Sequence, residues 1–186
     1  MRLRRVLLAL PLFVEASSLG SELKVGTRLT YASEAGEQPA WRVDSLVRGL
    51  AHEGRTGCVF VRFAPSDART VCAAGDTIVA WSAAARRWSP SRTIGAHSRL
   101  EIAQPSGARV VYTTGAVEAD TISGRTLSVV VTRVSTFDST GREVRRLDER
   151  YAPGLLTATS GVFAVPDSAR EGEWRTTRSF RLMRIE

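Results

Sequence analysis

The two cysteines, Cys58 and Cys72, are the side chains of this sequence with the clearest chemical role. They flank a turn signal at Pro65-Ser66-Asp67, so a hairpin about this turn would place them opposite each other. Directly opposed residues of antiparallel strands have Cβ atoms about 4.5–5.5 Å apart, which is close to the geometry of a disulfide. Two buried free thiols are the alternative. In an oxidising compartment we expect the disulfide, which would stabilise the fold by roughly 3 kcal/mol.

The sequence predicts no metal site and no cofactor. Zinc sites need closely spaced cysteines and histidines, whereas the two histidines, His52 and His97, lie far from each other in the sequence. A thioredoxin-like redox role requires Cys-x-x-Cys, which does not occur. The glycine-rich loops that hold phosphates, Gly-x-Gly-x-x-Gly and Gly-x-x-x-x-Gly-Lys, do not occur either.

No catalytic residue is assigned. The Gly-x-Ser-x-Gly pentapeptide of α/β-hydrolases is missing, and we expect both histidines to lie in solvated loops. Asp148 and Glu149 are adjacent carboxylates. Because neighbours on a strand point to opposite faces, they would not act together, and we expect each to pair with a nearby arginine. An enzyme of unrecognised type stays an alternative. It would require His52 or His97 beside a carboxylate in a cleft.

Arginine supplies nearly all of the positive charge. The formal net charge is +7, and Lys24 is the only lysine. Because guanidinium groups suit phosphate and carboxylate, an arginine-based binder of polyanionic envelope components is an alternative function. The arginines are dispersed along the sequence, however, which is typical of solvated sheet faces. The nearest candidate for base stacking is Trp81–Trp88 with Arg92, but we expect these tryptophans to pack in the core and predict no nucleic-acid partner.

The first twenty residues have the organisation of a secretory signal peptide. Three arginines precede an uncharged apolar run, Val6–Val14, and the small residues Ala16, Ser17, Ser18 and Gly20 end the segment. A membrane span needs about 20 apolar residues, so neither this run nor any later one is long enough. Cleavage fits after Ser18 or after Gly20, and no nearby cysteine offers a lipid anchor. We expect residues 1–20 to be a leader and the protein to be periplasmic or extracellular, rather than a cytoplasmic protein with a buried first element.

Residues 21–186 are predicted to form one all-β domain. Turn signals recur at short intervals between runs rich in valine, threonine, isoleucine and aromatics, as in antiparallel β-proteins. The turn at Asp138–Gly141 predicts a hairpin between the two runs that flank it. We expect nine to eleven strands in a curved sheet or an open β-barrel. The clearest strands cover Cys58–Phe63, Leu127–Phe137, Arg142–Tyr151 and Trp174–Ile185.

Two segments fit a helix as well as a strand. Apolar residues between Val43 and Ala51 have helical spacing, although Gly49 would weaken such a helix by roughly 1 kcal/mol. We favour a strand over Trp41–Val47 because its neighbours are predicted strands. The alanine triplet within Ser82–Arg87 is compatible with one helical turn.

A corner sequence, Tyr151-Ala152-Pro153-Gly154, follows the charged strand that returns from the turn at Gly141. Together with the preceding valine- and threonine-rich strand, it makes residues 126–165 resemble the TapB-like family of exported bacterial β-proteins of unknown function. The chain differs from that family at Arg150, where an aromatic is common, and at Leu155–Thr157, where a glycine-rich step is common. The resemblance implies an exported, curved antiparallel sheet or open barrel, and it implies no reaction.

The function that these observations favour is that of an exported, non-enzymatic β-domain. Because the mouths of β-barrels commonly hold ligands, we expect it to bind an apolar ligand or an envelope protein partner. The residues of such a binding site are unknown from sequence. A continuous cavity inside the sheet would support the ligand, whereas an interior filled by core side chains would leave only surface interaction.

Overall fold

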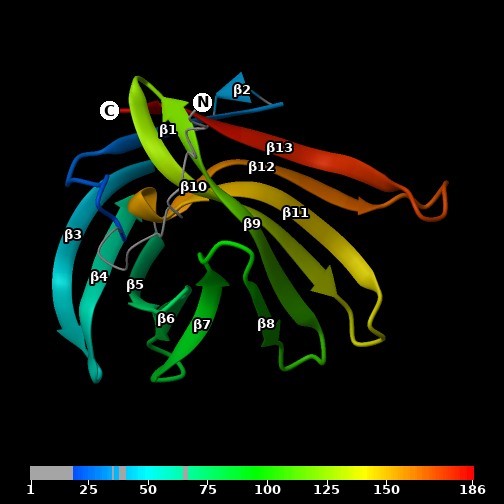
Figure 1. Ribbon diagram of the computed structural model, residues 1–186, viewed down its shortest axis with the longest axis horizontal. Helices are drawn as coiled ribbons and strands as arrows, with labels where there is room; N and C mark the ends of the chain where they lie inside the picture. Colours follow the sequence, from blue (N-terminus) through cyan, green and yellow to red (C-terminus); the bar gives the residue numbers. More distant parts are fainter. Residues whose placement is uncertain (1–18, 35, 38–40, 65–66) are drawn as a thin grey trace, which may run out of the picture.

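The computed structural model describes residues 19–34, 36–37, 41–64 and 67–186, and within these the chain forms one antiparallel sheet (Figure 1). Most of the predicted leader lies outside the described residues. The all-β, single-domain prediction is confirmed. The strands are β1 (Arg28–Ser33), β2 (Gly36–Glu37), β3 (Trp41–His52), β4 (Arg55–Ala64), β5 (Asp67–Ala74), β6 (Thr77–Ser82), β7 (Arg87–Thr93), β8 (Arg99–Ala103), β9 (Arg109–Ile122), β10 (Arg125–Phe137), β11 (Glu143–Ala152), β12 (Thr157–Pro166) and β13 (Trp174–Ile185), and η2 is a 3-10 helix over Pro153–Leu155.

The strand order makes the sheet an almost closed barrel. The order is β7-β6-β5-β4-β3-β1-β13-β12-β11-β10-β9-β8, with β2 paired to β1. The two edge strands, β7 and β8, are consecutive in the sequence and lie near each other (Figure 1). No ladder joins them among the described residues. The segment that connects them is held by Thr114, whose hydroxyl donates to the carbonyl of Gly95.

The thirteen strands of the described residues exceed the nine to eleven that we expected from turn signals. The turn between β6 and β7 consists of residues 83–86, three alanines and Arg86, and therefore carries neither glycine nor proline. Arg86 nevertheless adopts a φ of 48° there. The segment is a β-turn and does not form a helical turn. The count was low in part because this turn is not visible in composition and in part because β2 is only two residues long.

The strand interpretation of the segment after Trp41 is confirmed, and β3 extends beyond the predicted end to His52. Gly49, which argued against a helix, has a φ of 66° and lies where the β3–β4 register shifts between Arg48 and Leu50. Glycine suits such a bulge because it adopts positive φ without steric cost. The helical spacing of the apolar residues between Val43 and Ala51 therefore arises from bulges, which interrupt the two-residue alternation of the strand.

The predicted β10–β11 hairpin is also confirmed. The Asp138 carboxylate accepts hydrogen bonds from the backbone N–H groups of Thr140 and Arg142, and Gly141 has a φ of 86°. The β10 strand begins before its pairing with β11, which starts at Val130. The tip of the β9–β10 hairpin therefore projects beyond β11, and Ser123 at this tip donates a hydrogen bond to the carbonyl of Met183 on β13.

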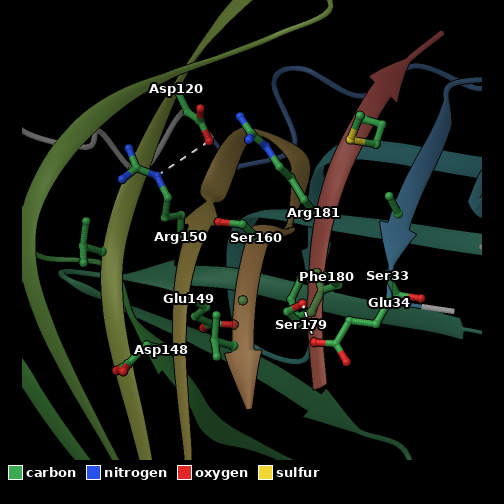
Figure 2. Close-up of a pocket in the computed structure, with 15 residues that line it drawn as sticks. Ser33, Glu34, Asp120, Asp148, Glu149, Arg150, Ser160, Ser179, Phe180 and Arg181 are labelled. Atoms are coloured by element: carbon green, nitrogen blue, oxygen red, sulfur yellow. Dashed lines mark hydrogen bonds and ion pairs between the residues drawn. The ribbon is translucent and has the colours of Figure 1, made fainter. Parts of the chain in front are cut away.

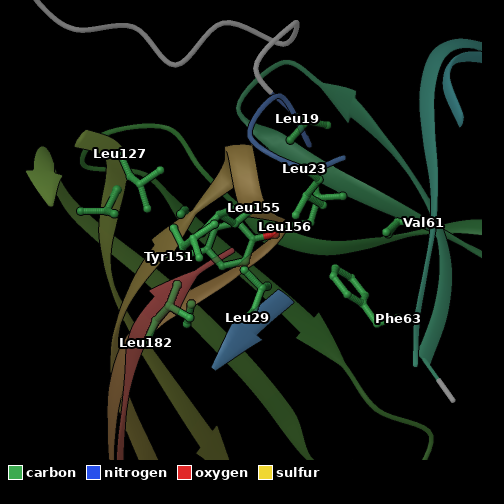
Figure 3. Close-up of a cluster of buried hydrophobic side chains, with 14 of the residues drawn as sticks. Leu19, Leu23, Leu29, Val61, Phe63, Leu127, Tyr151, Leu155, Leu156 and Leu182 are labelled. Carbon is green, nitrogen blue, oxygen red and sulfur yellow. The ribbon is translucent and has the colours of Figure 1, made fainter. Parts of the chain in front are cut away.

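One end of the barrel interior is filled by apolar side chains (Figure 3). Leu19 and Leu23 precede β1, and Leu155 and Leu156 come from the corner at η2. Hydrogen bonds tie the two segments together, because the N–H of Gly20 donates to the carbonyl of Pro153. The corner thus ends β11 as predicted and also closes the barrel at this end.

Candidate functional site

The other part of the interior contains a cavity of about 400 Å³. Its size falls within the roughly 300–1,000 Å³ that is usual for small-molecule sites. The walls come from strands far apart in the sheet, which face one another across the barrel. The lining residues are Tyr31, Trp41, Arg69, Arg92, Leu147, Glu149, Tyr151, Leu156, Thr157, Ala158, Phe163, Arg178 and Phe180.

Aromatic rings form one continuous wall of this cavity. The Phe180 ring centroid lies 6.0 Å from that of Tyr31 and 6.1 Å from that of Phe163. Tyr31 in turn contacts Trp41 edge-on at 6.5 Å. Gly161 permits this arrangement, because a Cβ at that position would lie 2.5 Å from the Phe180 ring. The wall offers apolar surface in tilted and edge-to-face ring geometry, which favours contact with a hydrocarbon chain.

A buried ion pair spans the barrel beside this wall. Arg92 on β7 donates to Glu149 on β11, and its guanidinium lies 3.7 Å from the centroid of the Tyr151 ring. Burial is the largest single influence and opposes the charge of Arg92, but the charge and hydrogen bond of Glu149, together with Tyr151 and Tyr112, raise the pKa of Arg92. The pair connects one edge strand to the opposite side of the sheet.

Arg69 is held against the cavity wall by three contacts. Its guanidinium lies 5.4 Å from the Phe63 ring centroid, donates to the carbonyl of Leu156 at 3.2 Å, and forms an ion pair with Asp67. The charges of Arg69 and Arg92 are thus both matched by carboxylates within the protein.

The mouth of the cavity is where its lining becomes exposed. Trp41 is 38% exposed, and Arg178 is exposed as well. Arg178 is paired with Phe163 in the β12–β13 ladder. Arg145, from β11, places its guanidinium 4.7 Å from the centroid of the same Phe163 ring. Neither Arg145 nor Arg178 forms an ion pair with any residue that the structure describes.

Burial raises the pKa of Tyr31 to about 12, although its hydrogen bond with Thr157 and the charge of Arg69 act in the opposite direction. Because the ordinary value is 10.0, this contribution to stability is complete below pH 10 and disappears as the pH rises to about 12. We expect the titration of Tyr31 to lower the free energy of unfolding in urea denaturation by roughly 2–3 kcal/mol over this range, and Tyr31→Phe to remove this loss. Identical alkaline profiles of the two proteins would contradict this.

The opposite face of the sheet carries a second, wider groove of about 810 Å³ (Figure 2). Arg150 and Arg181 line it, and they alternate along their strands with Glu149 and Phe180, which point into the barrel. Many of its polar groups already have partners. Arg150 lies 3.6 Å from Asp120, and the hydroxyl of Ser179 donates to Glu34 at 3.2 Å (Figure 2).

The predicted disulfide between Cys58 and Cys72 is present. Val59 pairs with Val71 in the β4–β5 ladder, so the cysteines are the next opposed pair, with Cα atoms 4.3 Å apart. Both are buried, 0% and 1% exposed, in a small cluster with Val79, Leu50 and Trp88, separate from the main core. The disulfide is therefore structural and lies away from the cavity.

The prediction that His52 lies in a solvated loop is wrong. The β3–β4 turn is only two residues long, so His52 is still part of β3 and pairs with Arg55. Its ring packs edge-on against Trp81 and Trp88, at 5.1 and 5.9 Å between centroids. Both tryptophans are half-buried. Trp88 packs against the small cluster around the disulfide, and neither tryptophan joins the main core, contrary to our expectation.

His97 lies exposed in the β7–β8 connection, as predicted. Among the described residues, neither histidine has a carboxylate within ion-pair distance. The described residues also contain no group of three histidine, cysteine or acidic side chains that could hold a metal ion. The arrangement that the enzyme alternative requires is therefore not seen in the described part of the chain.

Asp148 and Glu149 point to opposite faces, as predicted, and each pairs with an arginine. Their partners are Arg133, which is opposite Asp148 in the β10–β11 register, and Arg92 across the barrel. A minority of the arginines is neutralised in the same way, which reduces the number available to a polyanion surface. The arginines in contact with a carboxylate include Arg42, Arg69, Arg92, Arg99, Arg109, Arg133, Arg146, Arg150 and Arg170.

The cavity residues, led by Tyr31, Arg92, Glu149 and Phe180, were not identified from the sequence. The one local signal was Gly161, a glycine within a strand pattern, which indicates close approach by another group. The described residues contain no helix that is long and apolar enough to span a membrane. No family model and no curated protein matches this chain, so the resemblance to the TapB-like family stays a prediction.

Proposed function

We propose that this protein is an exported, non-enzymatic binding protein that holds an apolar ligand inside its barrel. The observation that carries this proposal is the 400 Å³ cavity with a wall of Tyr31, Phe163 and Phe180. The interior is packed at one end and contains this cavity beside the packed part, which supports a ligand within the sheet over interaction through the surface alone. Binding would remove apolar surface from water on both partners.

The proposal also includes export of the protein from the cytoplasm. Export is supported by the signal-like first twenty residues and by the Cys58–Cys72 disulfide. We infer cleavage after Ser18, because Leu19 is buried in the core and Gly20 is hydrogen-bonded to the corner at Pro153. Intact-mass measurement of the exported protein should give Leu19 as the first residue, and an unprocessed chain with free thiols would contradict export.

The ligand proposal is tested by filling the cavity. Leu147 lies on the wall beside Phe180, and Leu147→Trp would occupy the cavity with its larger ring. We expect the neutral dye N-phenylnaphthylamine to gain fluorescence with the wild-type protein, and Leu147→Trp to weaken its binding by at least about tenfold, since each tenfold corresponds to 1.4 kcal/mol.

The matched control is Val162→Trp, on the neighbouring strand and on the opposite face. Val162 is exposed and lines the outer groove, so its replacement fills that groove and leaves the cavity unchanged. Dye binding that is lost in Val162→Trp but kept in Leu147→Trp would place the ligand in the outer groove and overturn the proposal. Absence of binding by the folded wild-type protein would do the same.

A further inference from the structure

We propose that the ligand is an anionic amphiphile with a single hydrocarbon chain, whose head group binds Arg145 and Arg178 at the mouth of the cavity. This inference rests on the proposed function and specifies the class of ligand and its direction of entry. The hydrocarbon chain lies inside against the aromatic wall, and the carboxylate or phosphate of the ligand stays near water.

The positions of the two arginines support a binding site for the head group. Both flank the Phe163 ring, Arg178 as its ladder partner and Arg145 with its guanidinium 4.7 Å from the ring centroid. Both are exposed, and neither is matched by a carboxylate of a described residue. Two unmatched guanidinium groups beside one apolar ring form a site for an anion attached to a hydrocarbon.

The charged residues deeper in the cavity determine the orientation of the ligand. Arg92 is already paired with Glu149, whose side chain is 3% exposed, and Arg69 is paired with Asp67. An anionic head group placed there would approach the Glu149 carboxylate and be repelled. The hydrocarbon chain, in contrast, finds apolar surface on Leu147, Phe180 and Ala158. The head group therefore binds at the mouth and the chain lies inside.

The volume limits the ligand to one chain. About 400 Å³ lies near the lower end of the range for small-molecule sites, which suits a fatty acid or a lysophospholipid better than a two-chain lipid. A cationic amphiphile is disfavoured, because the two arginines at the mouth would repel its head group.

The experiment compares laurate with dodecanol, which share a hydrocarbon chain and differ in the head group. Each is titrated below its micelle concentration against protein carrying N-phenylnaphthylamine, and displacement of the dye is measured. We expect the wild type to bind laurate at least about tenfold more tightly than dodecanol, because two exposed ion pairs together contribute a free energy of that size. We also expect the affinity for laurate, but not for dodecanol, to fall as salt is added.

Variants then locate the head group. Arg145→Gln combined with Arg178→Gln should abolish the preference for laurate over dodecanol by lowering the affinity for laurate. Arg181→Gln is the matched control, because Arg181 is an exposed arginine of the same strand that faces the outer groove. It should keep the preference. Lauryl phosphate should behave as laurate does, since the site recognises charge.

Two results would overturn the inference. One is equal affinity of the wild type for laurate and dodecanol, and the other is a preference that persists in the Arg145→Gln, Arg178→Gln protein. In either case the proposed function would stand, because dodecanol would still displace the dye. Failure of the folded protein to bind the dye, laurate and dodecanol would instead overturn the proposed function itself.

Discussion

Glu149→Gln should lower the free energy of unfolding by about 3–5 kcal/mol, because it leaves the Arg92 guanidinium buried without its counter-charge. The side chain of Glu149 is 3% exposed and that of Arg92 is 19% exposed, so water replaces little of the lost interaction. The denaturant midpoint should fall while the slope of the transition stays unchanged, since the native state keeps its compactness.

The adjacent residue provides the control for this prediction. Asp148 pairs with Arg133 on the solvent-exposed face of the same strand, where the two side chains are 50% and 53% exposed. Asp148→Asn should therefore change the free energy of unfolding by less than about 1 kcal/mol. Replacing both buried partners, Arg92→Met with Glu149→Leu, should recover most of the loss. Equal effects of Glu149→Gln and Asp148→Asn would show that the cross-barrel pair contributes no more than a surface pair.

Removal of the disulfide should have an effect of similar size. Cys58→Ala with Cys72→Ala releases a loop that spans fourteen residues, which corresponds to a loss of roughly 3 kcal/mol in the chain-entropy model. The measurement is urea denaturation of the oxidised wild type, the double variant and the wild type in the presence of reductant. We expect the last two transitions to coincide.

Burial of the bond predicts how it is reduced. Because both cysteines are almost completely enclosed by Val79, Leu50 and Trp88, thiol reagents reach them only when the β4–β5 hairpin opens. Reduction without denaturant should therefore be slow and should accelerate sharply at the urea concentrations where the protein unfolds. Rapid reduction of the native protein, or a double variant as stable as the wild type, would contradict a stabilising role.

Local features of the sequence were sufficient to predict much of the sheet. The Asp138–Gly141 turn fixed one hairpin, and the position of Pro65 between Cys58 and Cys72 predicted a disulfide from two pairing strands. Such signals act over a few residues, through side chains that bond to nearby backbone or set φ. The turn at Ala83–Arg86 lacked them, so it was not among the turn signals and was compatible with a helical turn.

The cavity could not be predicted from local sequence signals, because its walls come together only when the sheet closes into a barrel. Arg92 and Glu149 are 57 residues apart, and Arg69 and Leu156 are 87 residues apart. No periodicity along the chain shows which of the dispersed arginines will face inward. His52 illustrates the same limit, since its neighbours Trp81 and Trp88 come from a different hairpin.

The seam between β7 and β8 has a consequence for how molecules of this protein behave together. Each of these strands presents one row of backbone N–H and C=O groups that no neighbouring strand satisfies within the described residues, and such rows can recruit a strand from another polypeptide. Pro90 on β7 lacks an amide hydrogen, and Arg99 and Glu101 place opposite charges along the short β8. These residues discourage intermolecular β-sheet growth, so the barrel can stay open at its side without seeding aggregates.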